Sequence, residues 1–253
     1  MTGNQYLFLV LKKYEPSAGT VYLVRRAANQ IIPILRVWSG NYFLGVNLSG
    51  SYAKGTAIKG GTDLDLFVSL RSIIPNTLHG IYQNLLRFLK QTGYTPRPQN
   101  VSIHINHQGL SVDIIPGKRQ SALSLSHSIY KNRTKTWIQT NIKRHIELIK
   151  YSRRRREIKL LKIWRQLYNL EFPSFYLELT VLKALLRRPY FSLEKNIGLI
   201  FKYLAVDFEN ARVVDPANTS NIISDDLTAA EKKKISNTAK ECLEKPNWDQ
   251  IIW

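Results

Sequence analysis

The strongest constraint on the fold of this chain lies in residues 48–68, LSGSYAKGTAIKGGTDLDLFV. The segment ends in DLDLFV, and alternation of apolar and polar residues with a period of two predicts a β-strand. Asp63 and Asp65 then share one face, with Cα atoms roughly 6.5 Å apart, and the leucines face a core. Two carboxylates at that separation can bind one divalent cation, or two cations about 4 Å apart. Such pairs also occur at solvated strand edges, so other residues have to support a metal site.

A glycine-containing turn precedes this strand. The apolar run 42–48 is followed by Gly50 and Ser51, and Ser51 is predicted to begin a helix. Glycine lets the backbone approach a ligand closely, and the N–H groups at the start of a helix attract phosphate. A phosphate site beside two carboxylates favours nucleotide chemistry.

A third carboxylate follows in a predicted β-hairpin. Residues 101–106 and 110–115 alternate around a turn that contains Gly109. The second strand, LSVDIIPG, carries Asp113 between apolar neighbours and is expected to stop at Pro116. A carboxylate in so apolar a strand is costly unless a partner compensates its charge, and a metal ion is a suitable partner.

These motifs, Gly50-Ser51, Asp63-x-Asp65 and Asp113, resemble in order and spacing the DNA-polymerase-β-like nucleotidyltransferase superfamily. Within it, the chain resembles the branch of oligoadenylate synthases and cGAS/DncV-like enzymes, with archaeal-type CCA-adding enzymes as the alternative. The resemblance implies an α+β nucleotidyltransferase fold, a mixed sheet with flanking helices, followed by an all-helical C-terminal lobe. It also implies that the three aspartates hold two Mg²⁺ ions, or Mn²⁺, and that NTPs, ATP in particular, are the substrates.

The resemblance extends to nucleotide contacts later in the chain. Lys162, in the sequence LLKIW, and Ser174, in PSFYLE, take the positions that hold the β- and γ-phosphates in these families, and Phe175 takes the position that stacks on the base. A triphosphate suits a lysine and a helix N-terminus. The alternative is an N-cap serine followed by a core phenylalanine.

The segment that contains Lys162 is preceded by four consecutive arginines, Arg153, Arg154, Arg155 and Arg156. A helix distributes consecutive residues around its circumference, so they cannot all face one groove. Two interpretations stay open: a solvated helix junction, or a contact with polyphosphate or an RNA backbone.

The chain is expected to divide at residue 120. Residues 1–120 would form the nucleotidyltransferase domain, with helices near 6–14, 20–38 and 78–89. From residue 121 onward, long helices without strands are expected, so residues 121–253 would form a helical lobe that binds nucleotide and nucleic acid. Thr228 and Glu231 predict a capping box for the closing helix.

The net charge of +19, from 37 Lys and Arg against 18 Asp and Glu, predicts a polyanionic partner. RNA or DNA as substrate or activator fits this charge. The single cysteine, Cys242, excludes an internal disulfide and predicts a cytoplasmic location. No apolar run reaches the length of a membrane span, so neither a membrane partner nor a signal peptide is expected.

The sequence therefore predicts an Mg²⁺-dependent nucleotidyltransferase that releases pyrophosphate. The favoured product is a cyclic or linear oligonucleotide signal, as in antiviral defence. The alternative is transfer to an RNA 3′ end, by a CCA-adding-like enzyme or a tRNA-modifying toxin. A third interpretation is a catalytically inactive nucleic-acid-binding protein.

Overall fold

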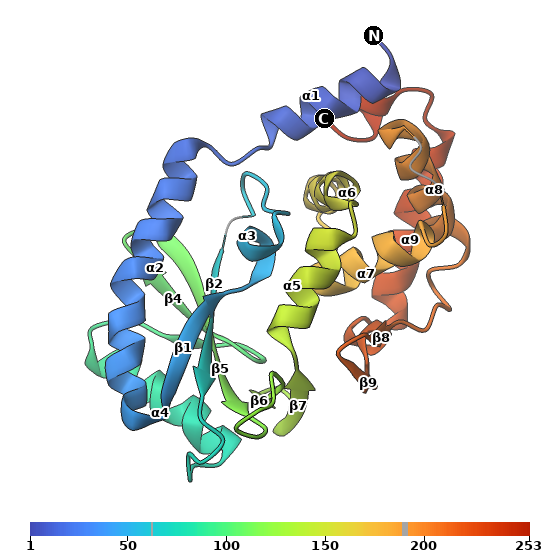
Figure 1. Ribbon diagram of the computed structural model, residues 1–253. Helices are drawn as coiled ribbons and strands as arrows, with labels where there is room; N and C mark the ends of the chain where they lie inside the picture. Colours follow the sequence, from blue (N-terminus) through green and yellow to red (C-terminus); the bar gives the residue numbers. More distant parts are fainter. Residues whose placement is uncertain (62, 189–191) are drawn as a thin grey trace. The chain divides into compact units, whose positions relative to one another are not determined.

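The computed structural model describes residues 1–61, 63–188 and 192–253, which form two compact units (Figure 1). The sheet unit comprises residues Pro16–Gly55 and Gly61–Glu147. The helical unit comprises Met1–Glu15, Thr56–Gly60 and Leu148–Trp253. This division differs from the predicted boundary at residue 120, because the first helix and a short central segment pack with the C-terminal helices.

The sheet unit is built on a mixed β-sheet in the order β1-β2-β5-β4-β3, with β6 paired to β5 and β7 to β6. Strands β2 and β5 are parallel, and the other neighbours are antiparallel. The strands are β1 (Phe43–Leu48), β2 (Leu64–Leu70), β3 (Arg97–Pro98), β4 (Ile103–His107), β5 (Leu110–Arg119), β6 (His127–Lys131) and β7 (Thr136–Thr140). The helices are α2 (Ala18–Ser39), the 3-10 turn η1 (Gly40–Tyr42), α3 (Gly50–Lys54), α4 (Leu78–Gln91) and α5 (Ile142–Tyr151), and α5 leads into the helical unit.

The core of the sheet unit lies between one face of the sheet and helices α2 and α4 (Figure 1). The even-numbered residues of β2, from Leu64 to Leu70, are fully buried there. Helix α4 begins at Leu78 as its periodicity predicts. Helix α2 begins at Ala18, two residues before the expected start, and is capped by Ser17, whose side chain accepts from the Thr20 N–H. Gly40 ends this helix.

Two expectations about the end of this unit are wrong. Strand β5 continues past Pro116 to Arg119, because its parallel pairing with β2 extends that far. Gly117 fits this strand since the Phe67 ring packs directly against its backbone and leaves no room for a Cβ. The segment after residue 121 is not purely helical, because β6 and β7 form a hairpin that extends the sheet.

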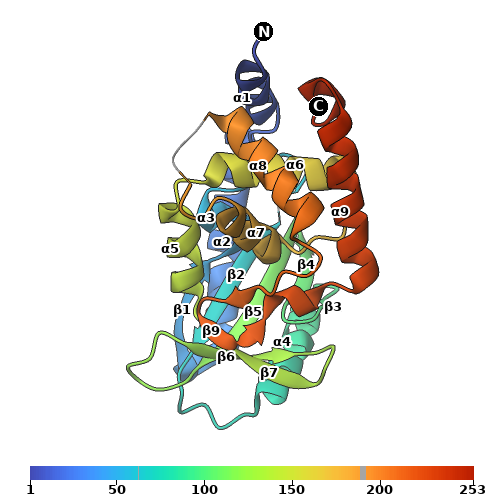
Figure 2. The same cartoon turned by 90° about the vertical axis from the view of Figure 1, so that its right-hand side faces the viewer.

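The helical unit buries one apolar cluster among α1, α6, α7, α8 and α9, whose packing can be followed in Figure 2. Trp164, Tyr176, Phe201 and Phe208 fill its centre. A capping box at Thr228 opens α9 as predicted. No helix in the described part of the chain is long and apolar enough to cross a membrane. The elements are α1 (Gly3–Lys13), α6 (Arg155–Leu167), α7 (Ser174–Ala184), α8 (Leu193–Val206), β8 (Val214–Asp215), β9 (Asn218–Ile222), η2 (Ile223–Asp226), α9 (Ala229–Glu244) and η3 (Trp248–Gln250).

A buried histidine joins β6 to β2 within the sheet unit. His127 Nε2 lies 2.7 Å from Ser69 Oγ, and Nδ1 lies 3.1 Å from the Leu125 carbonyl oxygen. A neutral ring satisfies both contacts, since Nδ1–H donates to the carbonyl and Nε2 accepts from the hydroxyl. The pKa of His127 is lowered to about 4, chiefly by burial and then by the nearby Arg119, against the opposing effect of the Leu125 contact.

The lowered pKa of His127 predicts that the free energy of unfolding decreases in acid. His127 is neutral in the folded protein at a pH where the unfolded chain is already protonated, so its contribution is complete above pH 6.5 and lost as the pH falls towards about 4. The loss at pH 4 is roughly 3 kcal/mol at most. Denaturant titrations between pH 4 and 7 should show a shallower pH dependence for His127→Gln than for the wild type. The exposed-histidine variant His79→Gln should keep the wild-type slope, and equal slopes for all three proteins would contradict the assignment.

Candidate active site

Two of the predicted aspartates lie side by side at the centre of the sheet. In the parallel pairing of β2 with β5, Asp65 is the register partner of Asp113. Register partners in adjacent strands point to the same face and are separated by about 4.8 Å. Both side chains are therefore on the face opposite to α2 and α4, since the even-numbered residues of β2 fill the core against those helices.

The third predicted aspartate, Asp63, lies just outside the strand. Strand β2 begins at Leu64, and Asp63 is exposed. Its negative charge contributes to the raised pKa of Asp113, so it acts on the same site. Within residues 1–61, 63–188 and 192–253, no three Asp, Glu, His or Cys side chains already converge as a metal site. The two strand aspartates are the fixed part of the cluster.

The turn at Gly50 is shaped around Asp65. Gly50 has a φ of +58°, and a Cβ there would overlap the Asp65 carboxylate. The Ser49 N–H donates to the Asp65 carbonyl oxygen at 2.9 Å, which fixes the turn to β2. The Ser49 hydroxyl is buried and has no hydrogen-bond partner among the described atoms. Helix α3 begins at Gly50, one residue before the predicted start at Ser51. The structure thus places the predicted phosphate turn against a predicted metal ligand.

Asp113 has a partner that the sequence interpretation missed. His104 on β4 is its register partner, and His104 Nδ1 lies 3.1 Å from Asp113 Oδ1. Burial raises the pKa of Asp113 and the charge of Asp63 raises it further, whereas the hydrogen bond from His104 lowers it. The sequence of the hairpin could have predicted this contact, because a two-residue turn at Gln108-Gly109 places His104 opposite Asp113.

Lys162 occupies a buried polar cluster inside the helical unit. Its ammonium lies 3.0 Å from Glu178 Oε1 and 2.9 Å from Thr56 Oγ1, and only 3% of the residue is exposed. The contact with Thr56 ties the short central segment of the chain to α6 and α7. Lys162 is predicted from the sequence only as a phosphate contact, and the structure pairs it with a buried carboxylate.

Ser174 and Phe175 open helix α7. Ser174 is the exposed first residue of the helix, and Arg165 Nη1 donates to its hydroxyl at 3.1 Å. Phe175 is half-buried and packs against the helical core. Arg165, which sequence reasoning missed, also donates to the Phe172 carbonyl, and burial lowers the pKa of its guanidinium. A cationic group at the start of a helix is suited to an anionic ligand.

The four arginines have different environments. Arg154 is buried, forms an ion pair with Glu157 at 3.4 Å and donates to the Arg188 carbonyl at 2.9 Å. It is therefore a structural residue and not a surface contact. Arg153, Arg155 and Arg156 are exposed, and Arg156 lies over the Phe8 ring. A nucleic-acid contact by these three stays a prediction.

Sequence comparison finds similarity to a named synthase. No family model matches the chain. The chain is 27% identical over 228 residues to the cyclic AMP-AMP-AMP synthase of Escherichia coli strain MS 115-1, which covers 81% of this chain and 71% of that protein.

Solved structures share the fold over almost the whole chain. The ATP complex of CdnC from E. coli MS115-1 matches with a TM-score of 0.80 at 21% identity, covering 96% of this chain and 91% of that one. The chain has the fold of polymerase-β-like nucleotidyltransferases. The GTP complex of CdnG from Bradyrhizobium diazoefficiens matches at 0.78 and 14% identity, covering 96% of this chain and 91% of that one. The Cid1 poly(U) polymerase matches at 0.73 and 15%, covering 98% and 97%. The resemblance to this superfamily and branch and the fold class, both predicted from the sequence, are confirmed.

The contact between Gly50 and Asp65 predicts the effect of one added methyl group. Gly50→Ala should displace the Asp65 carboxylate, and misplacement of about 1 Å costs about 10²-fold in turnover. Pyrophosphate release from NTPs measures the loss. The control is Gly93→Ala, because Gly93 has a φ of +90° but no atom within 4 Å of the added methyl. Equal activities for the two variants would show that the turn does not shape the site.

The burial of Asp113 predicts a gain of stability at the expense of activity. The pKa of Asp113 is raised above the ordinary 3.8 of an aspartate. Ionisation of Asp113 therefore destabilises the fold as the pH rises through this raised pKa. Asp113→Asn should therefore increase the free energy of unfolding at pH 7 by about 0.5–2 kcal/mol while nucleotidyl transfer is lost. The gain should disappear at pH 3.5. The exposed-site control Asp225→Asn should change neither quantity, and a destabilised Asp113→Asn would contradict the interpretation.

Proposed function

We propose that this nucleotidyltransferase joins NTPs, ATP among them, into short cyclic or linear oligonucleotides. The observation that carries the proposal is the pairing of Asp65 with Asp113 beside the Gly50 turn, on a fold shared with CdnC. The sequence relative named cyclic AMP-AMP-AMP synthase supports a product of this class. Such oligonucleotides serve as signals, and a cytoplasmic role in antiviral defence is part of the proposal.

The residues present fit a divalent cation. Asp63, Asp65 and Asp113 offer only carboxylate oxygens, which Mg²⁺ prefers. The raised pKa of Asp113 reflects a buried carboxyl that a cation would stabilise in its charged form. The unpartnered Ser49 hydroxyl provides a further oxygen next to Asp65. When bound, Mg²⁺ lowers the pKa of an attacking hydroxyl and neutralises charge on the phosphates. A second ion and use of Mn²⁺ belong to this proposal.

The remaining groups of the chain have distinct roles in this proposal. His104 orients Asp113 and keeps its pKa from rising further. The backbone at Gly50 and Ser51 contacts phosphate, because the missing Cβ allows close approach. By the resemblance, Lys162 and Ser174 contact the β- and γ-phosphates and Phe175 the base. Arg165, beside Ser174, joins this set on the strength of its contact with the serine hydroxyl.

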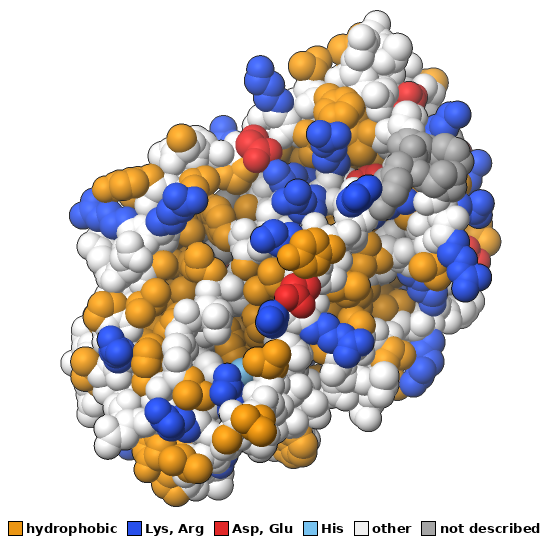
Figure 3. All heavy atoms as spheres, in the orientation of Figure 1, with side chains coloured by type: hydrophobic (Ala, Val, Ile, Leu, Met, Phe, Trp, Pro, Cys, Tyr) orange, Lys and Arg blue, Asp and Glu red, His pale blue; other side chains and the backbone are white. Residues whose placement is uncertain are grey.

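Transfer to an RNA 3′ end is the second candidate function. Structural similarity to the Cid1 poly(U) polymerase favours it, and so does the net charge of +19. Lys and Arg side chains are spread over the face drawn in Figure 3, where acidic side chains are few. This basic character suits a polyanion as acceptor or activator.

Product analysis distinguishes the two functions. The purified chain is incubated with labelled NTPs and Mg²⁺, with and without tRNA or double-stranded nucleic acid. We expect small labelled products, resistant to phosphatase where they are cyclic. Label on RNA would favour the terminal transferase, and no product under any condition would contradict both. Asp63→Asn with Asp65→Asn should abolish either activity, because two of the three carboxylates are lost.

A further inference from the structure

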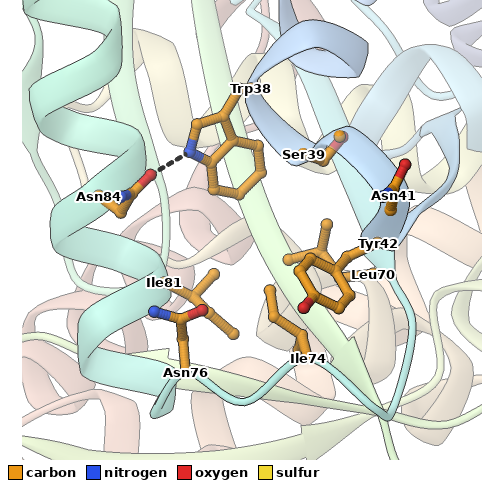
Figure 4. A pocket seen from close by; sticks show the side chains of 10 residues that line it. Trp38, Ser39, Asn41, Tyr42, Leu70, Ile74, Asn76, Ile81 and Asn84 are labelled. Atoms are coloured by element: carbon orange, nitrogen blue, oxygen red, sulfur yellow. Dashed lines mark hydrogen bonds between the residues drawn. The ribbon is translucent and has the colours of Figure 1, made fainter.

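Two adjoining cavities lie on the helix-covered side of the sheet unit, apart from the aspartates. The first holds about 310 Å³ and is shown in Figure 4. Trp38, Tyr42 and Ile74 surround it, and the Trp38 indole N–H donates to Asn84 Oδ1 at 2.8 Å. Asn76 lies at its border. No charged side chain lines this cavity, so it suits a flat, neutral group with hydrogen-bonding edges.

The second cavity is basic and holds about 460 Å³. Lys118, Arg119 and Trp137 line it together with the start of helix α4. Trp137 is 59% exposed, so its indole face is available to a ligand. The first turn of α4 adds partial positive charge to the two cations. A phosphate near Lys118 and a base on the Trp137 face would satisfy both features.

The two cavities are neighbours, because Asn76 lines both. Leu70 in the first cavity is the register partner of Lys118 in the second. Side chains alternate between the faces of a sheet, so Leu70 and Lys118 point away from the face that carries Asp65 and Asp113. A ligand in these cavities is therefore separate from the catalytic residues.

The charge of this part of the chain favours an anion. Asp113 is the single acidic residue between positions 66 and 146 of the sequence, and it lies on the opposite face. The β6–β7 hairpin is also basic, since it carries Lys131, Arg133 and Lys135. Trp137 belongs to the same hairpin, because it pairs with Tyr130 of β6. No carboxylate on these elements neutralises Lys118 or Arg119.

We propose that the two cavities form a second nucleotide-binding site, which takes a short single-stranded oligonucleotide. One base enters the neutral cavity between Trp38 and Tyr42, where amide groups such as Asn84 meet its edge. The connecting phosphate lies near Lys118, and the neighbouring base stacks on Trp137. The site does not depend on the proposed reaction, because it uses no residue of the aspartate cluster.

Binding measurements on the full chain test the proposal. Fluorescence anisotropy with labelled pApA, in EDTA and without NTP, should give an affinity about tenfold above that of AMP in competition, because a second base stacks. Binding of a 12-nucleotide RNA then shows whether the ligand is a free short oligonucleotide or a segment of a longer strand. Binding much tighter than pApA indicates a segment of a longer strand held also by the basic hairpin, and equal binding indicates a free short oligonucleotide.

Matched variants localise the binding. Asn76→Asp places a negative charge between the cavities and should weaken pApA binding about tenfold, as should loss of the stacking face in Trp137→Ala. Asn29→Asp introduces the same charge on the exposed surface of α2, and Tyr22→Ala removes an aromatic that is 64% exposed, so both should bind pApA as the wild type does. AMP binding as tightly as pApA, or equal losses in the variants and their controls, would overturn the proposal.

Discussion

The parallel pairing of β2 with β5 is the interaction on which the rest of this structure depends. It places Asp65 beside Asp113 on one face and the fully buried side chains of β2 on the other. Register is strict here, since a slip of one residue in either strand would turn its carboxylate into the apolar core. The same pairing fixes Gly50, because the turn after β1 is bonded to the backbone of Asp65. Core packing and site geometry are thus set by one register.

The charges of the aspartates oppose the geometry in which the fold holds them. Asp113 is half-buried beside another carboxylate, and burial together with the charge of Asp63 raises its pKa. His104 opposes that rise with one hydrogen bond, which compensates only part of the cost of a buried charge. The aspartate cluster is consequently a locally unfavourable arrangement that the surrounding apolar strands stabilise. Such an arrangement is typical of functional sites, where stability is given up for chemistry.

The sequence predicts the elements of this site better than its surroundings. Alternation and turn residues predict β2, the β4–β5 hairpin and α4, because each is a local pattern. They miss the β6–β7 hairpin, whose strands are short and polar on one side, and they miss the pairing that carries β5 past Pro116. They also give no sign that Lys162 is buried beside a carboxylate. Its partners Thr56 and Glu178 are far away in sequence, and only tertiary structure brings them together.

The distribution of charge separates two uses of the same sheet. On one face, acidic residues gather where a cation would compensate them. On the other, Lys118 and Trp137 lie in a part of the chain that has almost no acids to neutralise a basic surface. A general requirement for solubility would scatter acids and bases over both faces. Their segregation instead follows the alternation of side chains along β2 and β5, so each face of the sheet attracts a ligand of different charge.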